Sequence, residues 1–330
     1  MAPKTANDLM RGAIDLHVHS EPDIVPRLMD DLDLAAAARG AGMAAILLKN
    51  HYLMTADRAR IVQKAVPGIH VFGGLVLNVP ACGGLNVDAV RAAIDLGAKA
   101  IWLPTISATN YIEHYARAAP GHIGARAQRY RSIPVPVLDA SGAPTRELSD
   151  ILALVADAGV ILGTGHLSAR ETKAVADAAL RAGVTRVLVN HPEIWSINMS
   201  VDDQRELAAR GATFERCICS ATNDSHDVTP LQIADHIRAV GAASTVMATD
   251  YGQVVSPRHR TGCAGTSSRC SRAGSRPRTS RRWSRRILRG CLGLCTNPIL
   301  RTVQGGVRRS DGQCETCRCT SGSSVVPTCT

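Results

Sequence analysis

The stretch GAIDLHVHS, residues Gly12–Ser20, joins an apolar strand pattern to two histidines that are separated by one residue. Its segment Ala13–Val18 has the apolar composition of a buried strand. Successive side chains of a strand point to opposite faces, so His17 and His19 share one face. Two imidazoles on one face at a strand end can approach one ion, and imidazole nitrogen is a common ligand of zinc and similar divalent metals. The stretch therefore predicts a strand that carries part of a metal site.

Further apolar runs follow this strand and alternate with segments at helical spacing. The other predicted strands are Ala44–Leu48, His70–Leu77, Lys99–Leu103, Val160–Gly163, Arg186–Val189, Ala212–Glu215 and Ser244–Ala248. The predicted helices are Asp31–Arg39, Ala56–Ala65, Val87–Leu96, Arg146–Ala158, Ala169–Arg181, Asp202–Ala209 and Pro230–Val240. Glycine follows most of these helices, as is common just beyond a helix C-terminus. This repeating order of helix, glycine turn and apolar strand predicts a parallel α/β sheet.

Eight strands with a helix between most pairs favour a (β/α)8 TIM-like barrel, which typically has about 250 residues. Residues 1–257 match that size. We expect Thr105–Leu138 to be an irregular insertion after the fourth strand, with a small hairpin around Ile133–Leu138. An open, doubly wound sheet is the alternative. It is disfavoured as a dinucleotide-binding fold because no Gly-x-Gly-x-x-Gly follows the first strand.

The net charge of +10 is divided unevenly between two parts of the chain. Residues 258–330 contain fifteen arginines, no lysine and two acidic residues, and they hold eight of the eleven cysteines. Their formal charge is +13, which leaves −3 for residues 1–257. We therefore expect two regions, a barrel in residues 1–257 and a separate basic tail in residues 258–330.

The tail is predicted to be disordered and to arise from an out-of-frame reading that begins near Pro257. Arginine without lysine, with abundant serine and cysteine, is typical of such a reading, and the last barrel helix would then be missing or replaced. The alternative is an arginine-rich segment that binds nucleic acid. It is not favoured, because the spacing of Cys314, Cys317 and Cys319 from Cys291 and Cys295 matches no recognised zinc finger, and a lone Cys-x-x-Cys is a weak signal. No apolar run is long enough for a leader or a membrane span, so we expect a cytoplasmic protein without membrane contact.

Three more strand ends carry residues that can bind metal. The fifth predicted strand leads to His166, the sixth to His191 and the eighth to Asp250. In a (β/α)8 barrel, the C-terminal ends of the strands meet at one face, where the chemistry takes place. Together with the two histidines of the first strand, these residues predict a divalent metal site, with zinc the expected ion.

This arrangement resembles the amidohydrolase superfamily, a group of metal-dependent hydrolases with a TIM barrel. The superfamily has His-x-His on strand one, histidine on strands five and six, and aspartate on strand eight. The resemblance covers about residues 12–255, and the motifs DLHVHSEPD, GTGHLS and VNHPE resemble a little-characterised branch.

The resemblance implies a role for each of these residues. His17, His19 and Asp250 would hold the more buried ion, while His166 and His191 would complete a second site or orient the substrate. Asp250 would take a proton from the metal-held water and pass it to the leaving group. The implied reaction is hydrolysis of an amide, lactone or ester of a small molecule, and a metal-dependent lyase or decarboxylase is the alternative.

One departure from the superfamily pattern concerns the fourth strand. Ala100–Thr105 lacks the carboxylated lysine or glutamate that bridges two ions in binuclear relatives, which favours a single ion over two. Lys49 could be carboxylated and bridge two ions, or stay cationic and bind an anionic substrate. His51 and Glu215 are further candidates for the site.

Substrate specificity is expected to lie in loops such as residues 105–132. The aromatic and basic residues of that loop favour an anionic small molecule. They are Tyr111, Tyr115, Arg126, Arg129 and Arg131. A homo-oligomer is compatible with the sequence.

Overall fold

The computed structural model describes residues 10–117, 133–222 and 228–254. The strands are β1 Ile14–Val18, β2 Ala45–Leu48, β3 His70–Phe72, β4 Gly74–Val76, β5 Ala100–Trp102, β6 Ile161–Gly163, β7 Val187–Asn190, β8 Thr213–Cys217 and β9 Thr245–Ala248. The helices are α2 Asp31–Gly40, α3 Ala56–Ala65, α4 Val79–Cys82, α5 Val87–Asp95, α6 Thr109–Arg117, α8 Arg146–Ala158, α9 Ala169–Arg181, α10 Val201–Ala209, α11 Cys219–Thr222 and α12 Pro230–Val240, followed by a 3-10 turn, η1 Ala242–Ser244. Each predicted strand and helix is present, so the predicted α/β alternation is confirmed.

The strands form two parallel sheets, one in the order β1-β2-β3 and one that runs from β4 to β9 in chain order. β3 and β4 are the two halves of the third predicted strand, on either side of Gly73. Val18 of β1 makes a parallel bridge to Tyr251, just after β9. The strand order is thus that of the predicted barrel. Its hydrogen-bond ladder is interrupted at Gly73 and is short between β1 and the residues after β9.

The interruption at Gly73 has a steric cause. A Cβ atom at Gly73 would overlap the backbone carbonyl of Thr55, and one at Gly74 would overlap that of Ala100. The Thr55 hydroxyl lies 2.8 Å from the amide nitrogen of Gly74 and accepts its hydrogen bond. Glycine is required here because another part of the backbone approaches the strand closely.

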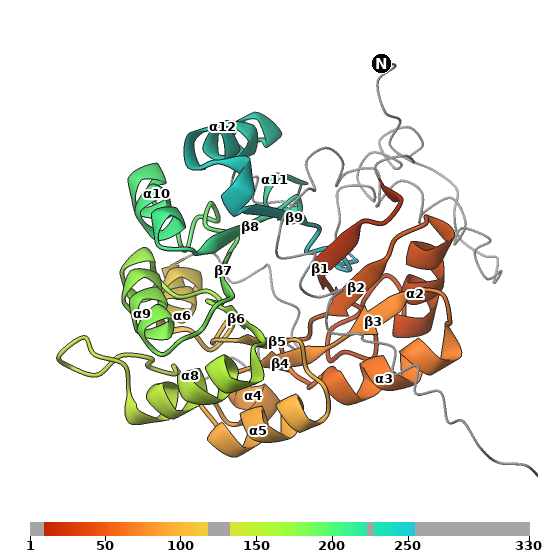
Figure 1. Ribbon diagram of the computed structural model, residues 1–330, viewed down its shortest axis with the longest axis horizontal. Coiled ribbons are helices and arrows are strands. Elements are labelled where there is room, and N and C mark those ends of the chain that lie inside the picture. The colour runs from red at the N-terminus through yellow and green to blue at the C-terminus, as the bar shows by residue number, and fades with distance from the viewer. Residues whose placement is uncertain (1–9, 118–132, 223–227, 255–330) are drawn as a thin grey trace, which may run out of the picture. The chain divides into compact units, whose positions relative to one another are not determined.

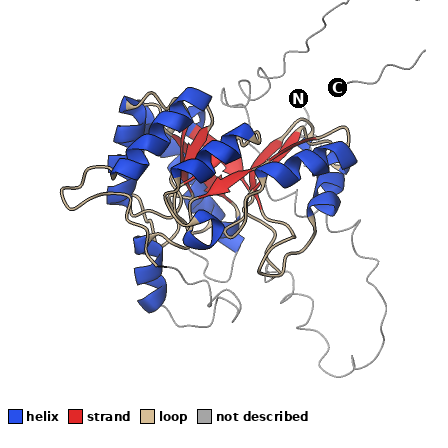
Figure 2. Cartoon of the chain, turned by 90° about the horizontal axis from the view of Figure 1, so that it is seen from below, coloured by secondary structure: helices blue, strands red, loops and turns tan. Residues whose placement is uncertain are grey.

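The helices pack against the outside of the strands (Figures 1 and 2). Their apolar residues recur at intervals of three and four, which places them on one face. The buried face of α8 consists of Leu148, Ile151, Leu152 and Val155. Ser168 and Glu171 form a capping box that fixes the start of α9 three residues after His166. The capping box therefore also fixes the backbone between His166 and α9.

The insertion after β5 differs from the expectation. It contains α6, Thr109–Arg117, and its residues 118–132 lie outside the described parts of the chain. Residues 133–136 form no strand, and the antiparallel pairing begins later than expected: Leu138 bridges Pro144, and the N–H of Thr145 donates to the carbonyl of Val137. Pro134 and Pro136 lack the N–H groups that a strand ladder needs, which explains why this apolar run is not a strand.

The predicted tail, residues 258–330, lies outside the described residues, and so does any last helix of the barrel. Across the described ranges, each helix is too short or too polar to span a lipid bilayer.

Candidate metal centre

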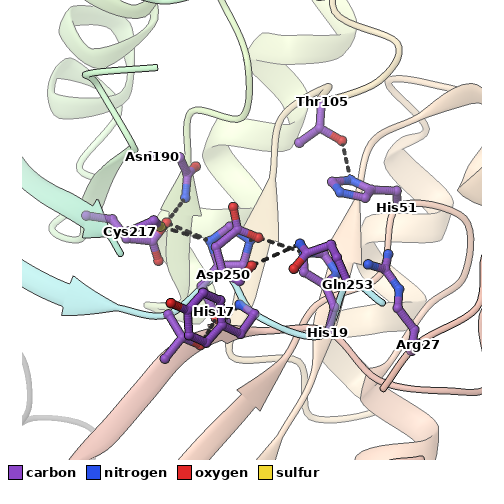
Figure 3. A network of polar contacts seen from close by, with 12 residues as sticks. His17, His19, Arg27, His51, Thr105, Asn190, Cys217, Asp250 and Gln253 are labelled. Atoms are coloured by element: carbon purple, nitrogen blue, oxygen red, sulfur yellow. Dashed lines mark hydrogen bonds and ion pairs between the residues drawn. The ribbon is translucent and has the colours of Figure 1, made fainter. Parts of the chain in front are cut away.

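The predicted metal-binding residues come together at the C-terminal ends of the strands. His17 lies in β1 and His19 directly after it, while His191 follows β7 and Asp250 lies two residues beyond β9. Ligand atoms of His17, His191 and Asp250 all lie within 4.8 Å of one another. The His19 ring is 5.2 Å from the ring of His17, measured between centroids. Side chains from three separate strands thus meet at one point (Figure 3).

The Asp250 carboxylate is the centre of this group. Its Oδ1 atom lies 3.1 Å from Nε2 of His17 and 3.1 Å from Nε2 of His19. The backbone of Asp250 has φ 51° and that of His191 has φ 23°, in the left-handed region that residues other than glycine rarely adopt. Such strain is held only where the surrounding structure imposes it, and it is frequent at functional sites.

His166 joins the cluster from β6. Its ring centroid is 4.9 Å from that of His191 and 6.0 Å from that of His51. The preceding Gly165 has φ 65°, and a Cβ atom there would overlap the carbonyls of Leu103 and Pro104. Glycine is therefore needed to carry the chain from β6 to His166.

Glu215 lies in β8 behind His17 and is fully buried. Its Oε2 atom is 3.0 Å from Nδ1 of His17 and 2.6 Å from Nδ2 of Asn190. Burial would raise the pKa of Glu215, but the charge and hydrogen bond of His17 lower it overall, so the carboxylate is ionised and only accepts. Nδ1 of His17 therefore carries a proton that it donates to Glu215, and Nε2 is the ring nitrogen that faces Asp250. This is the usual way in which a protein orients a metal-binding histidine.

Cys217 is a second neighbour of His17. Its Sγ atom lies 3.6 Å from Nδ1, so that His17, Glu215 and Cys217 form another group with ligand spacing. The Glu215 oxygen is already engaged by His17 and Asn190, and burial raises the pKa of the Cys217 thiol well above its usual value. The group around Asp250 is the better candidate for an ion.

The electrostatics favour a cation beside Asp250. Burial would lower the pKa of His17, but the charges of Asp250 and Glu215 outweigh it and raise the value to about 9. Burial lowers the pKa of His19 to about 3 and that of His191 to about 4. The carboxylates thus stabilise positive charge at His17, while the other imidazoles stay neutral and keep lone pairs for an ion.

Unpaired nitrogen atoms provide a direct test of whether the residues fit a metal. Nδ1 of His19, His166 and His191 is buried in each case without a hydrogen-bond partner, and so is Nε2 of His17, apart from its ion-pair contact with Asp250. An unsatisfied buried donor or acceptor costs about 1–3 kcal/mol. Ligand atoms of His17 and His191 lie within 4.8 Å of the Asp250 carboxylate, and such a set matches the nitrogen and oxygen ligands that zinc takes. The residues therefore fit a divalent ion.

Lys49, just after β2, is also fully buried at this site. Its Nζ atom has no hydrogen-bond partner and lies 5.4 Å from the centroid of the Trp102 ring. Burial lowers the pKa of Lys49, although the charges of Asp250 and Glu215 oppose that effect. The amine therefore keeps its donors free and faces the carboxylates of the site.

His51 is held by a network that the sequence did not reveal. The Oδ1 atom of Asn78 accepts from the backbone N–H of Thr105, and its Nδ2 atom donates to Oγ1 of Thr105 at 2.7 Å. The Thr105 hydroxyl then has Nδ1 of His51 as its acceptor, at 2.8 Å. Burial lowers the pKa of His51 well below its usual value, so we assign the neutral form with the proton on Nε2. His51 can therefore donate a hydrogen bond into the site.

Asn190, the last residue of β7, is a second site residue that the strand pattern does not indicate. Its Oδ1 atom accepts from the backbone N–H of Gly165 at 2.9 Å, and its Nδ2 atom donates to Glu215. Asn190 thereby joins the ends of β6, β7 and β8. Its position directly before His191 in Val-Asn-His is the one signal that could have identified it.

Solved structures that are similar to this chain include three hydrolases. One is an amidohydrolase from Pseudomonas aeruginosa, with 11% identity, a TM-score of 0.44, and coverage of 76% of this chain and 78% of that chain. An organophosphorus hydrolase from Deinococcus radiodurans has 12% identity, a TM-score of 0.42 and coverage of 75% and 77%. A mutant PTE-like lactonase from the same organism has 12% identity, a TM-score of 0.44 and coverage of 75% and 80%. No curated protein matches the chain.

A family model matches residues 12–215, from the start of β1 into β8. The matched region contains the four clustered histidines of β1, β6 and β7 together with Glu215, and it ends before Asp250. The match covers more than half of the chain, which therefore belongs to DUF6282, a family of unknown function.

Proposed function

We propose that this protein is a metal-dependent hydrolase that acts on an amide, lactone or ester bond of a small molecule. The observation that carries the proposal is the group of ligand atoms from His17, His191 and Asp250 within 4.8 Å of one another, beside buried imidazole nitrogens that have no hydrogen-bond partner. Their position at the C-terminal ends of parallel strands is the position of the active site in (β/α)8 barrel enzymes. Zinc as the ion and the cytoplasm as the location stay predictions from the sequence.

The ion would be held by His17, His191 and Asp250, with His19 beside Asp250 and His166 beside His191. When bound, a divalent ion lowers the pKa of a water molecule and polarises a substrate carbonyl. The role of Asp250 is to accept a proton from the attacking water and to return it to the leaving group. Its pKa, which burial would raise but His17 lowers well below the usual value, keeps it ionised to accept that proton.

His51 and Lys49 would bind the substrate. The proton on Nε2 of His51 can be donated to a substrate oxygen, since Thr105 holds Nδ1. Lys49 has free donors close to the carboxylates and would stabilise negative charge that develops on the substrate. Carboxylation of Lys49, which would let it bridge two ions, is the second form of the proposal.

The first experiment measures metal content per chain by mass spectrometry on the full-length protein. The test variant is His17→Ala/His19→Ala, and His70→Ala, an exposed histidine of β3, is the matched control. We expect one or two zinc ions in the wild type and in the control, and none in the double variant. Equal zinc in the double variant would refute the site and would direct attention to the cysteines of residues 258–330.

The second experiment identifies the reaction. The zinc-loaded protein is assayed with panels of esters, lactones and N-acyl compounds, and release of CO2 from carboxylic acids is measured in parallel. Hydrolysis that disappears in the His17→Ala/His19→Ala variant supports the proposal. Release of CO2 without hydrolysis would contradict it and would favour a lyase that uses the same residues.

A further inference from the structure

The loop between β1 and α2 folds back onto the site. Within the loop, the N–H of Glu21 donates to the carbonyl of Met29 at 2.9 Å. Leu28 donates its N–H to the carbonyl of Gly252, and Arg27 makes an antiparallel bridge to Gln253. The loop is thereby fastened to the segment that directly follows Asp250. Arg27 is consequently held close to the candidate metal centre.

The side chain of Arg27 is nearly buried, with 4% of its surface exposed. Its Nε atom donates to Oδ2 of Asp23 at 2.6 Å, and the Asp23 side chain has no exposed surface. Among the described residues, no other atom of the guanidinium has a hydrogen bond or an ion pair. Both terminal nitrogens therefore keep their donors, while the pair with Asp23 fixes the orientation of the group.

The guanidinium is directed toward the histidines. Figure 3 shows the side chain of Arg27 extending on the side of the site where His51 and His19 lie. Burial is the main cause of the low pKa of His19, about 3, and the charge of Arg27 is the next cause. Arg27 also contributes to the low pKa of His51, after burial and other cationic groups. These effects agree with a guanidinium that lies within electrostatic reach of both rings.

We propose that Arg27 binds a carboxylate group of the substrate through its two terminal nitrogens. A guanidinium whose Nε is already engaged presents a planar pair of donors, which fits the two oxygens of a carboxylate. The substrate class is then a small carboxylic acid that carries a hydrolysable bond. This assignment rests on the proposed function, because it names the substrate of that same site.

A carboxylate is favoured over a phosphate by the balance of charge. Asp23 already compensates the charge of Arg27 at hydrogen-bond distance. The charge of Lys49, the other cation among the described residues of the site, is offset by the carboxylates of Asp250 and Glu215. A phosphate group with close to two negative charges would need more positive charge than the described residues offer.

The test measures binding by calorimetry on the full-length protein, both zinc-free and zinc-loaded. The probes are succinate, glutarate, the neutral succinamide and inorganic phosphate. The variants are Arg27→Met and Arg27→Lys, and Arg91→Met is the matched control, since Arg91 lies at the surface in a pair with Asp88. Circular dichroism and zinc content are recorded for each variant.

We expect succinate or glutarate to bind the wild type, with succinamide far weaker. Arg27→Met should weaken the dicarboxylate by about tenfold to a hundredfold, the size expected for hydrogen bonds to a charged group. Arg27→Lys should have a smaller effect, and Arg91→Met none. If Arg27→Met fails to fold, Arg27→Lys alone still decides the matter, because it keeps the charge and loses the planar fork.

Three outcomes would overturn the assignment. They are an absence of dicarboxylate binding to the wild type, equal binding in folded wild type and Arg27→Met, and phosphate binding that is tighter than either dicarboxylate. The proposed function fails independently, when the wild type binds no zinc. Succinate binding that depends on Arg27 in the zinc-free protein would still support the role of Arg27 in that case.

Discussion

Replacement of Glu215 by glutamine tests whether this buried carboxylate orients His17 for metal binding. Glutamine keeps the size of the side chain but removes the charge and one of the two acceptor oxygens. In the wild type, Oε2 accepts from Nδ1 of His17 at 3.0 Å and from Nδ2 of Asn190 at 2.6 Å. In the variant, the amide NH2 would either face one of these donors without a hydrogen bond, or the single uncharged oxygen would accept from both donors more weakly than the carboxylate does. His17 would then lose its fixed proton position.

The expected magnitude follows from these two contacts. A hydrogen bond to a charged group contributes about 1.5–3 kcal/mol. Loss of a carboxylate that orients a metal-binding histidine typically weakens metal binding by about tenfold to a hundredfold. We therefore expect Glu215→Gln to raise the zinc dissociation constant by about that factor, while the fold is retained because the volume is unchanged.

The assay is a competitive titration of zinc against a chromophoric chelator, with full-length protein. Glu206→Gln on α10 is the matched control, since that carboxylate is exposed and pairs with Lys173 at the surface. A zinc dissociation constant for Glu215→Gln within twofold of the wild-type value would refute the reasoning. Glu215 would then be a buried structural carboxylate and not the group that orients His17.

Three other substitutions test different parts of the structure. Gly163→Ala should lower the free energy of unfolding by about 2–3 kcal/mol in urea denaturation, because the new methyl group would overlap the buried indole of Trp102, and an unchanged midpoint would contradict this packing. Lys173→Met should lower the free energy of unfolding by at most about 1 kcal/mol in the same assay, since its two carboxylate partners on α10 are partly exposed to solvent. A larger decrease would mean that solvent screens these ion pairs less than their exposure indicates. Thr105→Val should remove the fixed tautomer of His51, seen as a change in its imidazole nitrogen chemical shifts, whereas identical shifts would show that Thr105 does not set the tautomer.

Most of the secondary structure could be predicted because it depends on local patterns. Buried parallel strands are continuous apolar runs, as in AILL of β2, and glycine follows the helices that precede them. The helix α6 was missed because Thr109 and Asn110 favour caps and turns over helix interiors. The antiparallel pairing expected around residues 133–138 begins only at Val137 and Leu138, for a local reason that the sequence does contain, the prolines at positions 134 and 136.

The candidate site was predictable to the extent that it follows the strand ends. His17, His19, His166, His191 and Asp250 each end or follow a strand, and parallel strands bring such residues to one edge. The residues that orient them have no such signal. Asn78 and Asn190 are polar residues among many, and only the structure brings them to Thr105 and Glu215.

By itself, the sequence determined the order of strands and helices and the edge at which the histidines gather, because periodicity and turn residues act over a few positions. The tertiary structure alone decided which nitrogen of His17 carries a proton, that Glu215 lies behind that ring, and that Arg27 returns to the site from the β1–α2 loop. These features depend on contacts between residues 198 positions apart, for His17 and Glu215, and 226 positions apart, for Arg27 and Gln253. Such contacts form only when the strands are packed side by side, and no local pattern in the chain encodes them.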